Sequence, residues 1–121
     1  MKRAAARLWI KALESGKYKQ TRGNLRDADG SMCCLGVLCH ISKQSAWTRL
    51  DFGDNRRAYG RGEDRDGLLL PESVQKWAGL KYPNPQFPCE NGKVFASVLN
   101  DDRNFTFKQI AALVRKHWRE L

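Results

Sequence analysis

The feature that most constrains the fold is "SMCCLGVLC", residues 31–39, the most apolar run in the chain, from which the stretch "CCLGVLCHIS", residues 33–42, continues. Burial of such a run is strongly favoured in water, so other elements must cover it. Cys34, Leu38 and Ile41 are spaced by four and three residues, which places them on one face of a helix of two to three turns. Gly36 has no side chain and would let a neighbouring segment approach closely. The run therefore predicts a buried helix in the core.

Amphipathic helices are predicted at both ends of the chain. Residues 3–15 carry apolar side chains on one face and a basic residue every four positions on another, and Gly16 stands where the helix should end. Near the other end, Thr106 and Gln109 have the spacing of a capping box, with Phe105 placed for a hydrophobic staple. The apolar stripe of that last helix consists of Ile110, Leu113, Val114 and Trp118.

The segments between these helices mix turns, short strands and short helices. Residues 17–32 predict an irregular hairpin that begins with a short strand at "KYKQ", and residues 71–78 predict a helix that starts at Pro71 and ends at Gly79. The prolines of "YPNPQFP" exclude a helix, "ENGK" predicts a tight turn, and "VFASVLND" predicts a short helical turn. The expected fold is an α+β domain of about four helices with a small two- or three-stranded antiparallel sheet.

A single domain, residues 1–121, is expected, because 121 residues of which 41% are hydrophobic suffice for one core. Residues 44–70 are the least regular part, with glycines, alternating charges and isolated aromatics. They predict a long irregular loop with an edge hairpin, and loops of that length are usually functional. Whether this loop closes over a site stays open, as does homo-oligomerisation.

The net charge of +9 makes anions the natural partners of this chain: nucleic acid, phosphorylated metabolites or an acidic protein surface. The excess lies in residues 1–26, which hold eight basic residues and one acidic residue. No apolar stretch approaches the length of a membrane span, and residues 1–13 lack the uninterrupted apolar core of a secretory signal. We therefore expect a protein of the cytoplasm, without membrane contact, whose four cysteines are free thiols.

No metal centre or catalytic residue is predicted. Cys34, Cys39, His40 and Cys89 are metal-ligand types, but their spacing matches no common zinc framework, and core cysteines are the favoured interpretation. A cysteine nucleophile needs a base, and the side chains of neighbours such as Cys39 and His40 diverge on a helix. We expect no cofactor and no enzymatic activity.

Carboxylates offer a weaker alternative. Asp27 and Asp29 flank a turn, and Asp101 and Asp102 follow Asn100, so either pair could hold a metal or act as acid and base. Aspartates in turns more often bond their own backbone, and that interpretation is favoured here. "GRGEDRDG" lacks the Lys-Ser/Thr ending of a phosphate-binding loop.

What remains is a basic surface with aromatic side chains. Arginine binds phosphate through two parallel hydrogen bonds, and tyrosine or tryptophan can stack on a base. Arg3, Arg7 and Lys11 on the first helix could form one continuous patch with the lysines that follow it, although solubility alone also explains such charges. The candidate ligand-binding residues are Lys17, Tyr18, Lys19, Gln20, Arg22, Arg26, Trp47, Arg56, Arg57, Tyr59, Asn100 and Asp101.

Four stretches carry a resemblance to a known family: "WIKALESGKYKQ", "CCLGVLC", "LPESVQKWAGL" and "LNDDRNFTFKQIA", in that order. The chain resembles, outside residues 44–66, a small uncharacterised protein family of tailed bacteriophages and prophages. None of the four stretches is a known catalytic signature. The polar residues within them are where a site shared with the family could lie: Lys17, Tyr18, Lys19, Gln20, Asn100 and Asp101.

The phage resemblance implies an accessory protein that acts in the cytoplasm of a bacterial host. Small phage accessory proteins are often anti-defence factors, and some sequester immune signals such as cyclic ADP-ribose derivatives or cyclic dinucleotides. A basic pocket with stacking side chains suits such anionic ligands. We therefore expect a protein that sequesters a phosphorylated nucleotide-derived ligand. The alternatives are a nucleic-acid-binding or host-protein-inhibiting phage protein and, less favoured, a small phosphodiesterase.

Overall fold

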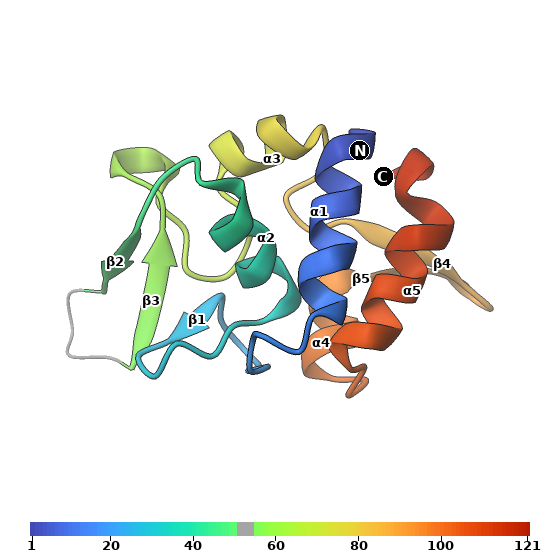
Figure 1. Cartoon of the computed structure of the whole chain (residues 1–121), viewed down its shortest axis with the longest axis horizontal. Helices are drawn as coiled ribbons and strands as arrows, with labels where there is room; N and C mark the ends of the chain where they lie inside the picture. Colours follow the sequence, from blue (N-terminus) through green and yellow to red (C-terminus); the bar gives the residue numbers. More distant parts are fainter. Residues whose placement is uncertain (51–54) are drawn as a thin grey trace.

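The computed structural model describes residues 1–50 and 55–121 (Figure 1). Its centre is α2 (Cys34–Ser42), whose residues from Cys34 to Cys39 are buried. The backbone carbonyl of Leu25 approaches Gly36 so closely that a Cβ there would lie 2.0 Å from its oxygen. Both the buried helix and the close neighbour at Gly36 are as predicted, and only glycine permits this approach.

Two longer helices, α1 (Arg3–Glu14) and α5 (Phe107–His117), pack side by side and run in opposite directions (Figure 1). Gly16, with a φ of 74°, follows the end of α1. Thr106 and Gln109 form the predicted capping box at the start of α5, which continues into the 3₁₀ turn η2 (Trp118–Glu120). Trp9 of α1 is fully buried and donates from Nε1 to the backbone oxygen of Cys34 at 3.0 Å, which ties α1 to α2.

A three-stranded antiparallel sheet lies on one side of α2. Its strands are β1 (Arg26–Asp27), β2 (Trp47–Arg49) and β3 (Arg56–Tyr59), in the order β1-β3-β2. The edge hairpin expected within residues 44–70 is present as β2 and β3, and η1 (Gly62–Asp64) follows it. Residues 51–54 of the expected loop lie outside the described residues.

A β-hairpin and two short helices complete the domain, and the hairpin lies on the side of α2 away from the three-stranded sheet (Figure 1). The hairpin consists of β4 (Gln86–Cys89) and β5 (Gly92–Phe95), so the turn predicted at "ENGK" is confirmed. The helices are α3 (Glu72–Ala78) and α4 (Ala96–Asp101). Pro71 is the N-cap of α3 and not, as predicted, its first residue, whereas Gly79 ends α3 as expected with a φ of 69°.

The prediction of a strand at "KYKQ" is wrong. This stretch makes one isolated bridge, between Gln20 and Met32, with backbone hydrogen bonds of 2.9 Å that join Thr21 and Lys19 to Met32. The bridge cannot lengthen into a ladder because the partner segment enters α2 directly after it. The strand of the 17–32 segment is β1, which pairs with β3.

The fold is therefore α+β, with five α-helices and two small antiparallel sheets in the described part of the chain. Among the described helices none has the length and apolar character needed to cross a membrane.

Candidate functional site

Five of the chain's polar and aromatic side chains meet where the C-terminal end of α2 approaches the three-stranded sheet. We call them the aromatic cluster, and its members are Tyr18, Arg26, His40, Trp47 and Tyr59. They come from the segment after α1, from β1, from α2, from β2 and from β3. Four of the five were candidate residues on sequence grounds, and the structure brings them together.

Trp47 is the centre of the cluster. Its indole Nε1 donates to Nδ1 of His40 at 3.2 Å, and the guanidinium carbon of Arg26 lies 5.2 Å from the centroid of its ring. The ring of Tyr59 meets Trp47 edge-on at a centroid distance of 4.9 Å, and the ring of Tyr18 meets His40 edge-on at 5.7 Å. Edge-on ring pairs and a cation over an indole are both attractive, so the cluster holds itself together.

The strand pairing explains why Trp47 is held in place. Trp47 and Tyr59 are partners in the antiparallel register of β2 and β3, so their side chains lie on the same face of the sheet. Tyr59 is buried, and its hydroxyl both accepts from the backbone nitrogen of Ser45 at 2.8 Å and donates to the Ser45 oxygen at 2.9 Å. A buried tyrosine, held by two hydrogen bonds, therefore supports a half-buried tryptophan whose remaining surface faces solvent.

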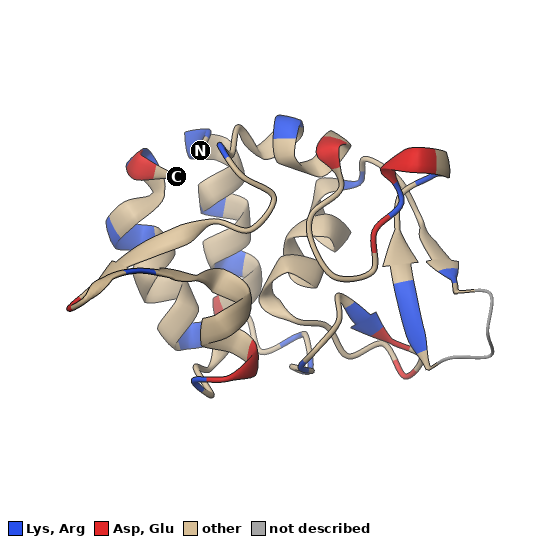
Figure 2. Ribbon diagram, turned by 180° about the vertical axis from the view of Figure 1, so that it is seen from behind, with Lys and Arg blue, Asp and Glu red and all other residues tan. Residues whose placement is uncertain are grey.

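Beside the cluster, arginines occupy neighbouring positions on all three strands; we call Arg26, Arg57 and Arg49 the arginine row. Arg57 of β3 is the register partner of Arg26 on one side and of Arg49 on the other. Figure 2 shows basic segments on all three strands. Because cross-strand partners point to the same face, the row lies on the face that carries Trp47. Like charges at opposed positions disfavour the sheet and raise the local positive potential, which attracts anions.

His40 is neutral in this setting at neutral pH. Partial burial of the imidazole, and then the charge of Arg26, lower the pKa of His40 from its ordinary value. The hydrogen bond requires the same state, because Nδ1 can accept from Trp47 only while it carries no proton. An anion bound beside Arg26 would offset its charge and favour protonation of His40, so the occupancy of this surface and the titration of His40 are coupled.

Lys17 and Lys19 flank Tyr18 in residues 17–32, which we call the cationic segment, and they lie at the margin of this surface. Lys17 and Lys19 are exposed, and Lys19 Nζ is 4.0 Å from an Asp29 oxygen in a pair whose side chains are 81% and 59% exposed. Such a pair contributes little to stability, so Lys19 can turn to another anion at small cost. Hydrogen bonds from Ser31 hold the pKa of Asp29 below its ordinary value, so Asp29 serves the turn.

Two further candidates, Gln20 and Asn100, face inward. Asn100 is fully buried, and its Oδ1 accepts from Gln20 Nε2 at 2.8 Å and from the Cys34 backbone nitrogen at 3.1 Å. Its Nδ2 donates to the Thr21 oxygen and to Asp101 Oδ1, both at 2.8 Å. Gln20 Nε2 also donates to the Phe105 oxygen at 2.8 Å.

With its amide bonded on all sides, Asn100 has no group left for a ligand. We assign it, with Gln20 and Asp101, a positioning role: together they fix the 17–32 segment against the start of α2 and against α4. This hydrogen-bond network is the physical reason that the cationic segment has a defined path on the surface of the domain.

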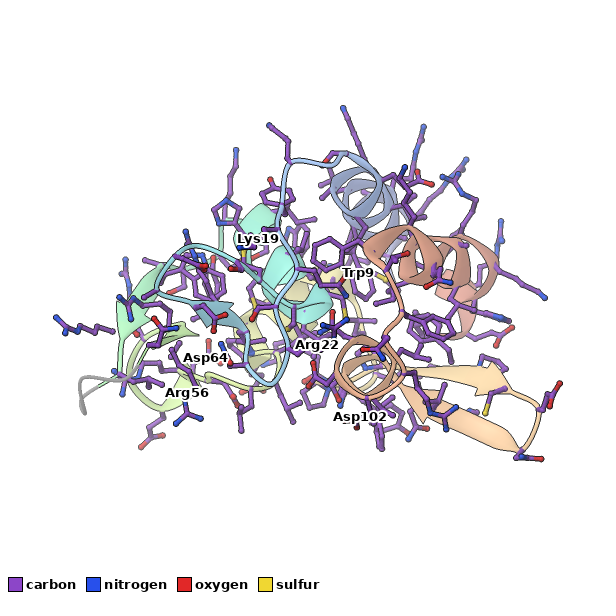
Figure 3. All side chains as sticks on the ribbon, turned by 90° about the horizontal axis from the view of Figure 1, so that it is seen from below. Trp9, Lys19, Arg22, Arg56, Asp64 and Asp102 are labelled. Atoms are coloured by element: carbon purple, nitrogen blue, oxygen red, sulfur yellow. The ribbon has the colours of Figure 1, made fainter. Side chains whose placement is uncertain are left out.

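Arg22 and Arg56 are not members of the cluster. In Figure 3, Arg56 and Asp64 lie at the sheet end of the molecule and Asp102 lies at α4, with Arg22 between them. No hydrogen bond, ion pair or ring contact joins Arg22 to the cluster within residues 1–50 and 55–121. Arg56 is the neighbour of Arg57 on β3, so its side chain points to the opposite face of that strand.

The cysteines give no sign of metal or nucleophilic chemistry in the described chain. Cys33, Cys34 and Cys39 are buried free thiols and Cys89 is exposed. Burial raises the pKa of Cys33 to about 12 and raises the pKa of Cys34 and Cys39 as well, which is the reverse of what a nucleophile needs. No group of three or more metal-ligating side chains that could hold a metal ion occurs among the described residues.

The basic residues of α1 belong to another surface. Arg7 and Lys11 line a groove between α1 and α5 together with Arg115. Neither residue makes a ring contact or hydrogen bond with the cluster within residues 1–50 and 55–121, so the groove is a second basic feature of the described surface.

Sequence reasoning missed His40 and Arg49 as site residues. His40 is the exposed position of an otherwise buried helix, and the apolar pattern of residues 33–42 already indicates that this polar residue faces outward. Its contact with Trp47, however, depends on the tertiary fold. Arg49 was part of an irregular segment. Its position in the row depends on the register of β2 with β3, which no local signal predicts.

Comparison with known proteins identifies the family but no activity. The family model described as "Domain of unknown function (DUF8296)" matches residues 1–118. The chain therefore belongs to that family. Neither a curated protein nor a solved structure gave a significant match.

Proposed function

We propose that this protein is a non-catalytic binding protein that holds a phosphorylated nucleotide-derived ligand on the aromatic cluster and the arginine row. The observation that carries the proposal is the placement of Arg26 over Trp47 on the face that also bears Arg49. This arrangement places an aromatic stacking surface beside guanidinium groups, whose paired N–H donors match the geometry of a phosphate. The buried thiols and the absence of a metal-ligand group among the described residues favour binding over turnover.

The geometry suits a ligand with a base and more than one phosphate. A guanidinium already held over an indole presents a flat face on which a base can stack, while its N–H groups remain available at the edge. Neighbouring strands are about 4.8 Å apart, so the backbones of Arg26 and Arg49, with β3 between them, are separated by about 10 Å. Their long side chains can reach two phosphates of one ligand, and Lys17 and Lys19 extend the field.

We further propose, from the resemblance to phage proteins, that the protein sequesters such a ligand in the cytoplasm of a bacterial host as an anti-defence factor. Sequestration needs affinity and a preorganised surface but no chemistry. The hydrogen bonds of Asn100 supply that preorganisation by fixing the cationic segment before any ligand arrives.

A second candidate is binding of single-stranded nucleic acid. The observation that favours it is openness: His40, Arg49, Lys17 and Lys19 are all exposed, so a chain could cross this surface without ending on it. Stacking on aromatic side chains beside a positively charged surface is how proteins bind single strands without sequence preference.

Calorimetric titration separates these functions, with ADP-ribose, a cyclic dinucleotide and a short oligothymidylate as probes. The double variant Arg26→Gln/Arg49→Gln should weaken binding of the preferred nucleotide at least a hundredfold, because charge-assisted bonds to phosphate contribute about 1.5–3 kcal/mol each. The matched control is Lys93→Gln/Lys108→Gln, which removes the same charge from exposed positions elsewhere. Equal weakening by both variants would mean that only net charge matters, and the proposed site would be refuted.

Salt and time distinguish the alternatives. A polymer that engages about 6–10 phosphates loses roughly a thousandfold or more in affinity between about 50 and 200 mM salt, whereas a two-phosphate ligand loses far less. Tight, salt-sensitive binding of oligothymidylate with no binding of the small nucleotides would replace the first function by the second. A nucleotide recovered with changed mass after incubation would identify a phosphodiesterase and refute the non-catalytic proposal.

A further inference from the structure

The second basic feature of the surface is the groove between α1 and α5, whose lining residues are distinct from those of the aromatic cluster. It has a volume of about 820 Å³, and its lining residues are Ala4, Arg7, Leu8, Ile10, Lys11, Glu14, Ser15 and Arg115. Leu8 is 47% exposed, although it lies in the middle of a helix whose opposite face is buried in the core. Because Leu8 lies in a groove, another surface could cover it, and burial of its apolar area would favour that contact.

The charges around the groove indicate what kind of surface that is. Arg7 and Lys11 lie one turn apart on α1, and Arg115 faces them from α5. The one acidic side chain of the lining, Glu14, is already engaged by Arg115 at 2.8 Å. Arg7 and Lys11 have no hydrogen bond or ion pair within the described part of the chain. The groove thus offers an apolar floor with a positive rim.

We propose that this groove docks an acidic amphipathic helix of a partner protein. The groove lining on this side runs from Ala4 to Ser15, about 18 Å of helix, which matches about three turns of a docked helix, and Ala4, Leu8 and Ile10 form its apolar floor. Apolar side chains of the partner would cover Leu8, while its Asp and Glu residues would pair with Arg7 and Lys11. A second copy of this chain is disfavoured, because it would present the same positive rim, and a nucleic acid would leave Leu8 uncovered.

The test is a selection of 16-residue peptides from a random display library on the folded protein, with counter-selection on the Leu8→Glu variant. Leu8 is exposed, so this change should leave the melting temperature within a few degrees. We expect enriched peptides with apolar residues at helical spacing and acidic residues between them. A synthetic peptide of that sequence should bind the wild type at least tenfold more tightly than Leu8→Glu, and it should perturb the amide NMR signals of residues 4–15.

The matched control is Leu68→Glu, which puts the same charge on another exposed leucine, 55% accessible and outside the groove. Binding to Leu68→Glu should equal binding to the wild type. The proposal is overturned by a selection that enriches nothing, by enriched peptides without the acidic amphipathic pattern, by equal loss of binding in both variants, or by a composition-matched scrambled peptide that binds as well. These outcomes do not involve Arg26 or Arg49, so this proposal and the proposed function fail independently.

Discussion

Replacement of Asn100 by alanine tests whether the buried amide holds the cationic segment in place. The change removes every bond made by the side chain. The Cys34 backbone nitrogen, at the start of the buried helix α2, and the Thr21 oxygen both lose their partner. Gln20 keeps its hydrogen bond to the Phe105 backbone oxygen. An unsatisfied buried polar group costs about 1–3 kcal/mol, so two such groups, one of them only partly buried, predict a loss of about 2–4 kcal/mol in the free energy of unfolding.

Urea denaturation followed by tryptophan fluorescence measures this loss, and Asn100→Asp sharpens the test. That substitution keeps the shape and the Oδ1 acceptor but places a second carboxylate oxygen against the Thr21 oxygen and Asp101. Burial and this repulsion should raise the pKa of the new carboxyl above its unfolded value. A group with a raised folded pKa binds more protons in the folded state, so the deficit relative to the wild type should shrink as the pH falls from 7 toward 5.

The control is Asn91→Asp, the same change at an exposed turn position between β4 and β5, whose effect should be small and independent of pH. A loss below about 1 kcal/mol for Asn100→Ala, or a pH-independent deficit for Asn100→Asp, would refute the reasoning, because the network would then not support the segment.

Three further outcomes follow from the packing and the charges. Gly36→Ala should lower the free energy of unfolding, measured with urea, by about 3 kcal/mol or more, because its Cβ would meet the Leu25 carbonyl oxygen at 2.0 Å. The control Gly67→Ala, whose Cβ would have its nearest neighbour at 3.6 Å, should lower it by less than about 1 kcal/mol. Similar losses for the two variants would contradict the packing of α2 against Leu25. In the native protein a thiol reagent should label Cys89 quickly and the three buried cysteines only after denaturation, and rapid labelling of all four would contradict their burial. Arg26→Gln should raise the pKa of His40 in an NMR titration, and an unchanged pKa would show that the charge of Arg26 does not act on His40. Because the pKa of His40 is lowered in the folded state, the contribution of His40 to stability is present above about pH 6.5. That contribution is lost as the pH falls through the pKa of the folded state.

The helices are the part of the fold that the sequence predicts best. Helix positions were predicted correctly by the apolar stretch of residues 33–42, the capping box at Thr106 and the glycines at positions 16 and 79, because periodicity, caps and breakers act within a few residues of chain. The same holds for the turn at "ENGK". The strand predicted at "KYKQ" failed for the opposite reason: a strand needs a partner, and the partner segment turns into α2 after Met32.

The candidate site shows the same division. Composition alone indicated a basic surface with aromatic residues, and Tyr18, Arg26, Trp47 and Tyr59 could be named from it. Only the tertiary structure placed Arg26 on Trp47, added His40 from a helix that the sequence marked as core, and aligned Arg49 with Arg57 through strand register.

The tertiary structure was also needed to show that Asn100 is buried and is not a surface residue. In the sequence an asparagine before two aspartates indicates a polar site, but its amide is buried and bonds to the backbone of Thr21 and Cys34 and to the side chain of Gln20. Residue type and local spacing determine which elements form and what charge the surface carries. Which side chains meet is decided by contacts between segments of the chain, some of them between residues 80 positions apart, and these contacts depend on how the whole core packs.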